Sequence, residues 1–140
     1  MGSRAIARVA GRVRKREALL WAARAALAAF FVLAGVPKLL GASFEVEMFV
    51  QIGAGDWLRY AVGVAELAGG LGLLVSPLTR LAAVGLALDM AGATIVNLAV
   101  LHSSAVLLTV PLCLALLAVA AKGTPDVGWT APSSRRSRRA

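Results

Sequence analysis

Three ionisable residues stand inside long apolar stretches of the sequence and could do chemistry there: Arg24, Glu66 and Asp89. A charge isolated at the centre of a membrane costs at least about 2.5 to 3.5 kcal/mol, so such groups are expected to pair and to mark functional sites. Counting about 1.5 Å of rise per residue from the inner end of each stretch places all three side chains in one layer. We therefore predict that Arg24 pairs with Glu66 or Asp89. The second carboxyl group is then a surplus acid that could hold a proton, which makes these three residues the candidate catalytic groups.

A second polar set, near the outer boundary, consists of Lys38, Asn97 and His102, and these residues are candidates for binding a cofactor. Lys38 can extend its ammonium group toward the membrane surface. His102 stands at the edge of a loop, where a solvated or capping histidine is more usual than a ligand. A metal site would need further ligands, and only Glu45 or Glu47 offers itself. No metal site is predicted.

The sequence lacks the common cofactor-binding motifs. Its single cysteine, Cys113, excludes an intramolecular disulfide and any CxxC motif, and is expected to pack as a small apolar residue. Its single histidine excludes a haem held by two histidines of one chain. No GxGxxG, P-loop or HExxH pattern occurs. The sequence therefore predicts no covalently bound cofactor and no redox enzyme that acts alone.

The elements that must position these residues are membrane-spanning helices. The chain has 140 residues, of which 59% are apolar and 16% are charged, and its mean hydropathy is +0.80. About a quarter of a soluble domain is charged. Crossing a hydrocarbon core roughly 30 Å thick takes about 20 helical residues, and four stretches qualify: about 18–40, 57–76, 79–101 and 103–121. The predicted fold is all-α, a bundle of four transmembrane helices within residues 17–121.

The net charge of +8 is concentrated at the two ends of the chain. Residues 1–16 carry six basic and no acidic side chains, and residues 122–140 carry five basic and one acidic side chain. Basic segments beside membrane spans stay in the cytoplasm, where they meet anionic lipids. Both tails are thus predicted to be cytoplasmic, in a multi-pass protein of the inner or plasma membrane. The second tail is expected to be disordered, and no nucleic-acid partner is expected.

The first connection is predicted to be longer than the other two. Residues 41–56 are too short and too charged to cross a membrane, and we expect an extracytoplasmic, interfacial or partly re-entrant helix that stops at Gly53-Ala54-Gly55. The other connections are a cytoplasmic turn at Ser76-Pro77 and an outer turn at His102-Ser103-Ser104. Close helix packing is expected at small residues of the second stretch, namely Gly69, Gly70 and Gly72.

Short motifs follow one another in a fixed order over roughly residues 20–105. They are Arg24-x5-Phe30-x4-Gly35-x2-Lys38-Leu39, Phe49-x3-Gly53, Glu66-Leu67-x-Gly69-Gly70-Leu71-x-Leu73-Leu74, Pro77, Arg80-Leu81-Ala82-Ala83 and Met90-x2-Ala93. Their order and spacing resemble the DoxX family of small four-helix membrane proteins. By this resemblance Arg24, Lys38 and Glu66 match polar motif positions, whereas Asp89 matches less clearly and the basic tails lie outside.

The resemblance leaves two functions open. Some members of the DoxX family are associated with the membrane part of thiosulfate:quinone oxidoreductase, or with membrane-bound redox complexes that handle thiols and superoxide. This implies an anchoring or quinone-facing, proton-handling subunit that works with a partner redox protein or further copies of itself. Others in the wider superfamily resemble assembly or trafficking factors, which implies a non-enzymatic scaffold. A pocket between helices that lipid can reach favours the first function, and a closed cluster of Arg24, Glu66 and Asp89 favours the second.

Overall fold

The computed structural model describes the backbone of residues 2–122 and the side chains from residue 9 onward. This part of the chain contains no strand and consists of five helices: α1 (Gly2–Leu40), α2 (Ser43–Ile52), α3 (Gly55–Leu74), α4 (Thr79–Ala99) and α5 (Val106–Lys122). The all-α prediction is confirmed, with four long helices and a short one at the predicted place between the first two. The prediction of a disordered second tail falls on residues 123–140, outside the described residues.

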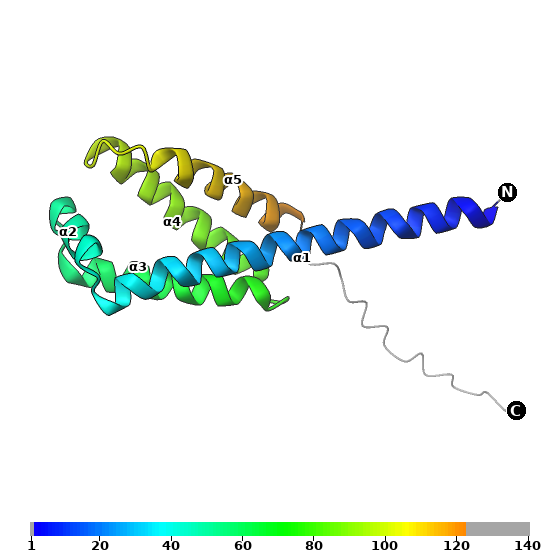
Figure 1. Cartoon of the computed structure of the whole chain (residues 1–140), viewed down its shortest axis with the longest axis horizontal. Helices are drawn as coiled ribbons and strands as arrows, with labels where there is room; N and C mark the ends of the chain where they lie inside the picture. The colour runs from blue at the N-terminus through cyan, green and yellow to red at the C-terminus, as the bar shows by residue number, and fades with distance from the viewer. Residues whose placement is uncertain (1, 123–140) are drawn as a thin grey trace, which may run out of the picture.

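The four long helices lie side by side, and α2 closes the end of the bundle opposite to the N-terminus (Figure 1). α1 packs against α3, α3 against α4, and α4 against α5. The first helix has 39 residues, roughly 58 Å at 1.5 Å per residue, so its N-terminal part extends beyond the bundle (Figure 1). The basic residues expected as a separate tail are therefore continuous with the first long helix. The Arg, Lys and Ala residues of this segment have high helix propensity.

Glycines allow α1 and α3 to approach each other until their backbones touch. A Cβ atom built on Gly35 would lie 2.8 Å from the carbonyl oxygen of Gly63, and one built on Gly70 would lie 3.0 Å from the carbonyl oxygen of Ala28. These distances leave no room for a side chain. Small residues at a helix crossing are the usual solution where lipid supplies no hydrophobic force between helices.

The other two glycines of this stretch face α4 instead. A Cβ atom on Gly69 would meet the side chain of Leu86 at 2.6 Å, and one on Gly72 would meet Cβ of Ala82 at 2.9 Å. The interpretation of Gly69, Gly70 and Gly72 as packing residues is confirmed. Consequently α3 is the central helix, pressed against α1 on one side and α4 on the other.

The outer surface of the bundle is apolar. Many large apolar side chains are exposed, and Leu33, Leu81, Leu88 and Leu107 are 70 to 80% exposed. Monomeric soluble proteins rarely expose apolar surface of this extent. α1 (over Val9–Leu40) and α4 are long and apolar enough to cross a membrane, and α5 is a shorter apolar helix. The bundle thus has the outside of a membrane protein, whose exposed leucines contact lipid.

The connections begin and end close to the predicted positions. α2 stops at Gly53, whose φ of 77° is in the left-handed region, and Gly55 follows with φ of 73°. This conformation costs glycine little, which explains the stop at Gly53-Ala54-Gly55. The turn at Ser76-Pro77 separates α3 from α4, and His102 lies in the connection from α4 to α5.

Candidate functional site

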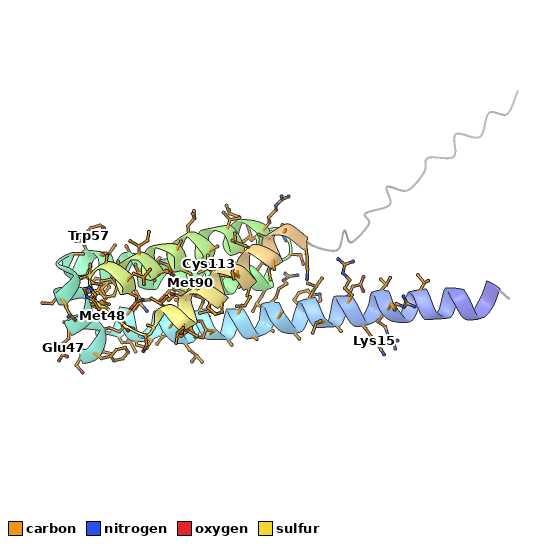
Figure 2. All side chains as sticks on the ribbon, turned by 90° about the horizontal axis from the view of Figure 1, so that it is seen from above. Lys15, Glu47, Met48, Trp57, Met90 and Cys113 are labelled. Carbon is orange, nitrogen blue, oxygen red and sulfur yellow. The ribbon has the colours of Figure 1, made fainter. Side chains whose placement is uncertain are left out.

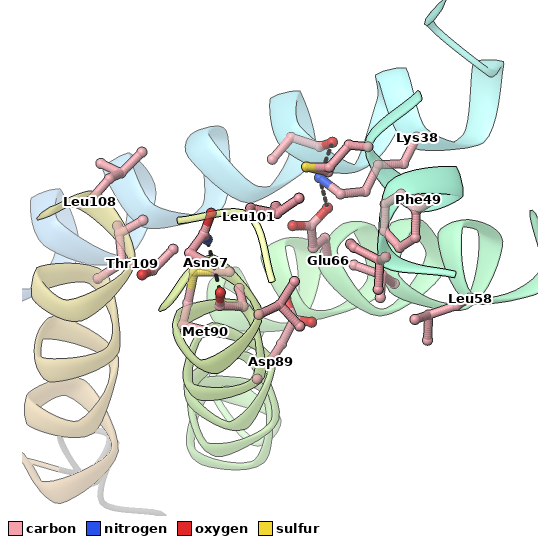
Figure 3. A pocket seen from close by; sticks show the side chains of 18 of the residues that line it. Lys38, Phe49, Leu58, Glu66, Asp89, Met90, Asn97, Leu101, Leu108 and Thr109 are labelled. Atoms are coloured by element: carbon pink, nitrogen blue, oxygen red, sulfur yellow. Dashed lines mark hydrogen bonds and ion pairs between the residues drawn. The ribbon is translucent and has the colours of Figure 1, made fainter. Parts of the chain in front are cut away.

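A cavity of about 420 Å³ lies toward the α2 end of the bundle, with walls from all five helices. Most of its wall is apolar, including Phe30, Met48, Phe49, Met90, Leu101 and Leu112. Its polar side chains are Lys38, Glu66, Asp89, Asn97 and Thr109 (Figure 3). An apolar cavity with a few polar groups at one place is the usual form of a site for a small molecule.

Lys38 is the cation of the site. It stands in the last turn of α1, is 8% exposed, and lies between α2 and α3. Its Nζ atom is 3.2 Å from Oε1 of Glu45 and 3.0 Å from Oε2 of Glu66, and it donates a further hydrogen bond to the carbonyl oxygen of Ala34 at 3.3 Å. Gly41, with φ of 72°, ends α1, and the chain turns back there into α2, which brings Glu45 within reach of Lys38.

The carboxyl groups outnumber this cation. Glu45 and Glu66 are 4% and 3% exposed, and Asp89 lies on the facing side of α4 (Figure 3). Oε2 of Glu45 and Oδ2 of Asp89 are buried without a hydrogen-bond partner in the part of the chain that the structure describes. Oε2 of Glu66 is instead paired with Nζ of Lys38. Buried polar atoms are normally satisfied, so the unpaired oxygens of Glu45 and Asp89 mark places where a ligand or a proton would be held.

Arg24 does not belong to this cluster, and the prediction that it pairs with Glu66 or Asp89 is wrong. Its Nε atom donates to the carbonyl oxygen of Leu73 at 2.8 Å, a second nitrogen donates to Oγ1 of Thr79, and the guanidinium lies 4.2 Å from the centre of the Trp21 ring. The last carbonyl groups of a helix have no partner within the helix. Arg24 therefore caps the end of α3 and ties it to the start of α4.

The reason for this error is the alignment of the helices along the bundle. Arg24 lies level with Leu73, seven residues beyond Glu66 in α3, and this separation is roughly 10 Å along the helix axis. Lys38 lies level with Gly63 instead, one turn from Glu66. The counter-ion of Glu66 is therefore the lysine that was placed in the outer layer.

Of the three residues predicted to lie near the outer boundary, two line the cavity and one does not. Lys38 and Asn97 both line the cavity, and Nδ2 of Asn97 donates to the carbonyl oxygen of Ala93 at 2.8 Å. His102 is exposed in the connection between α4 and α5, with Nδ1 3.2 Å from the carbonyl oxygen of Val100, and does not line the cavity. This loop position agrees with the solvated or capping histidine that was expected.

Two residues of the site were not identified from the sequence. From the sequence, Glu45 is named only as a possible metal ligand; the available signal for its role is an acidic residue seven positions after Lys38, in the segment that follows the first long stretch. Arg59 is 3% exposed and donates to the carbonyl oxygen of Lys38. It also pairs with Asp56, with 3.0 Å between Nη2 and Oδ1. Arg59 thus closes the carbonyl end of α1 and fixes the backbone that carries Lys38.

The helices α4 and α5 are joined by hydroxyl and thiol groups. Oγ1 of Thr94 lies 2.8 Å from Oγ1 of Thr109, and Sγ of Cys113 lies 3.4 Å from the carbonyl oxygen of Ala87. Cys113 is half-buried against the apolar core, as expected for a small packing residue. These contacts hold the wall of the cavity that is opposite to Lys38.

Comparison with known proteins gives one match. No curated protein and no solved structure matches the chain. The sequence profile of the DoxX-like family matches residues 22–121, which include the C-terminal half of α1, all of α2 to α4 and α5 except its last residue, with the cavity between them. Because this match covers most of the chain and agrees with the earlier resemblance, the chain belongs to the DoxX-like family, a family of membrane proteins.

Proposed function

We propose that this protein is a membrane-embedded subunit of a quinone-linked redox system, and that its cavity holds the quinone head group. The observation that carries the proposal is the cavity itself, which combines apolar walls with Lys38, Glu66 and Asp89 at one place. A quinone has a polar head on an apolar tail, and its reduction consumes protons. A titratable group within hydrogen-bond reach of the head group is therefore required.

The residues present fit such a ligand in size and in chemistry. A volume of about 420 Å³ falls in the usual range for a small-molecule site. Oδ2 of Asp89 has no hydrogen-bond partner among the described residues, and the carboxyl groups of Glu66 and Asp89 can exchange protons with a head group. Electrons would be supplied by a partner redox protein, because a sequence with one cysteine and one histidine has no ligand set for an iron–sulfur cluster or a two-histidine haem.

Filling the cavity tests the proposal. Gly92 lines the cavity and has open space where its Cβ atom would stand, so Gly92→Phe is expected to place a ring in the cavity without disturbing the backbone. Gly85 has the same open space two turns earlier on α4 but lies outside the cavity, so Gly85→Phe is the matched control. We expect Gly92→Phe to weaken binding of a short-chain quinone or its reduced form at least about tenfold, measured by titration in detergent, and Gly85→Phe to leave it unchanged.

Absence of binding to the wild-type protein in either redox form would contradict the proposal. If no redox enzyme co-purifies with it in mild detergent either, the scaffold function becomes the better explanation.

We also propose that all four long helices cross the membrane and that both ends of the chain are cytoplasmic, because both ends are basic. In a Cys113→Ala background, cysteines placed at Ser3 and Ser137 are expected to resist a membrane-impermeant thiol reagent applied to intact cells. Cysteines at Ser43 and Ser104, which are exposed at the start of α2 and in the α4–α5 connection, are expected to react. Labelling of either end in intact cells would overturn this topology.

A further inference from the structure

The hydrogen-bond donors of the cavity are already committed. Lys38 directs its ammonium group at three oxygens, those of Ala34, Glu45 and Glu66. Nδ2 of Asn97 donates to a backbone carbonyl one turn away. The hydroxyl group of Thr109 accepts from or donates to Thr94, and lies 3.5 Å from the carbonyl oxygen of Val106. An ammonium group has three N–H bonds, so Lys38 has none left for a ligand.

The free polar atoms of the cavity are acceptors. Oδ2 of Asp89 is buried and accepts no hydrogen bond within the described residues, and the side chains of Asp89 and Glu66 face the same space (Figure 3). An ionised carboxylate can only accept hydrogen bonds. Lys38 compensates one negative charge, and it is shared with Glu45 behind it. The cavity is therefore complementary to a ligand that brings hydrogen-bond donors on an apolar body.

We infer that the cavity binds the reduced, hydroxyl-bearing quinol more tightly than the oxidised quinone, an inference that rests on the proposed function. A hydroxyl group of a quinol can donate to Oδ2 of Asp89 and satisfy this buried oxygen. The carbonyl groups of a quinone offer only lone pairs, which would face the carboxylates with no donor between them. A hydrogen bond to a charged acceptor is stronger than one between neutral groups. The hydroxyl groups of the quinol are therefore expected to form stronger hydrogen bonds in this site than they form with water.

Three ligands with the same short tail separate these effects: the quinone, the quinol kept reduced under anaerobic conditions, and the dimethyl ether of the quinol, which has lost both donors. We expect the wild-type protein to bind the quinol at least about tenfold more tightly than either of the other two. In Asp89→Asn the side chain keeps its size but gains a donor, so the preference for the quinol is expected to fall toward equality. Glu47→Gln, a change of the same kind at an exposed position of α2, is the control and should keep the full preference.

Equal or tighter binding of the quinone by the wild-type protein would overturn this inference and leave the proposed function intact. Tight binding of the dimethyl ether would also overturn it, because the hydroxyl donors would then be unnecessary. If none of the three ligands binds, the proposed function fails as well. The comparison of ligands on the wild-type protein does not depend on the folding of any variant, and Glu66→Gln provides a second substitution should Asp89→Asn be unstable.

Discussion

Lys38→Met is expected to destabilise the folded protein by about 3 to 5 kcal/mol, the usual cost of removing one partner from a buried ion pair. Methionine matches the unbranched apolar stem of lysine but lacks the ammonium group and its charge. The carboxylates of Glu45 and Glu66 would then be buried with no counter-ion. Thermal unfolding in detergent measures the loss. It should be smaller in acid, where the carboxylates can take up protons.

Two comparisons identify the cause of this loss. Lys15→Met removes an exposed lysine from the same helix (Figure 2) and is expected to change stability little. Adding Glu45→Gln and Glu66→Gln to Lys38→Met removes the uncompensated charges, and should recover a large part of the stability. If Lys38→Met is as stable as the wild type, or if the additional substitutions recover nothing, the ion pairs do not hold this end of the bundle together.

Arg24→Ala is expected to cost about 2 kcal/mol, and this cost should not depend on pH. The substitution removes a charge-assisted hydrogen bond to the carbonyl oxygen of Leu73 and the contact with the Trp21 ring, interactions of roughly 1.5 to 3 and 0.5 to 1 kcal/mol respectively. Thr79 partly compensates, because its hydroxyl group also donates to the carbonyl oxygen of Leu73 at 3.1 Å. Thermal unfolding over a range of pH is the measurement.

The absence of a pH dependence is the informative part of this experiment. All the partners of Arg24 within the described part of the chain are uncharged, whereas a pairing with Glu66 or Asp89 would make the loss grow as the carboxyl groups ionise. Arg80→Ala, at an exposed position near the same end of the bundle, is the control and should have little effect. A loss that increases with pH for Arg24→Ala alone would show that the arginine interacts with the carboxylates.

The helices could be predicted from the sequence because their signals are local. Apolar length predicts the long helices, and the left-handed glycine at Gly53 and the proline at Pro77 predict where helices stop. The observed ends lie within two or three residues of most predicted ends. The start of α1 is the exception, because nothing in a basic, helix-favouring segment separates the part inside the bundle from the part beyond it.

The partners of the charged residues could not be predicted in the same way. Depth was counted from one end of each stretch, but the relative height of α1 and α3 is decided by the contacts of Gly35 with Gly63 and of Gly70 with Ala28. A shift of two turns exchanges Arg24 for Lys38 as the neighbour of Glu66. Glu45 reaches the site only because α2 folds back over the end of α1, and no spacing rule contains that information.

Lys38 is shared between two helices, and this sharing has a thermodynamic consequence. The same ammonium group attaches α2 through Glu45 and faces the cavity through Glu66. Any ligand or proton that changes the charge at Glu66 must therefore change how firmly α2 is attached. Coupling free energies are reciprocal. If a ligand in the cavity changes the affinity of another protein for α2 by some factor, binding of that protein to α2 must change the affinity of the cavity for the ligand by the same factor. The short helix α2 thus couples the outer surface of the bundle energetically to its interior.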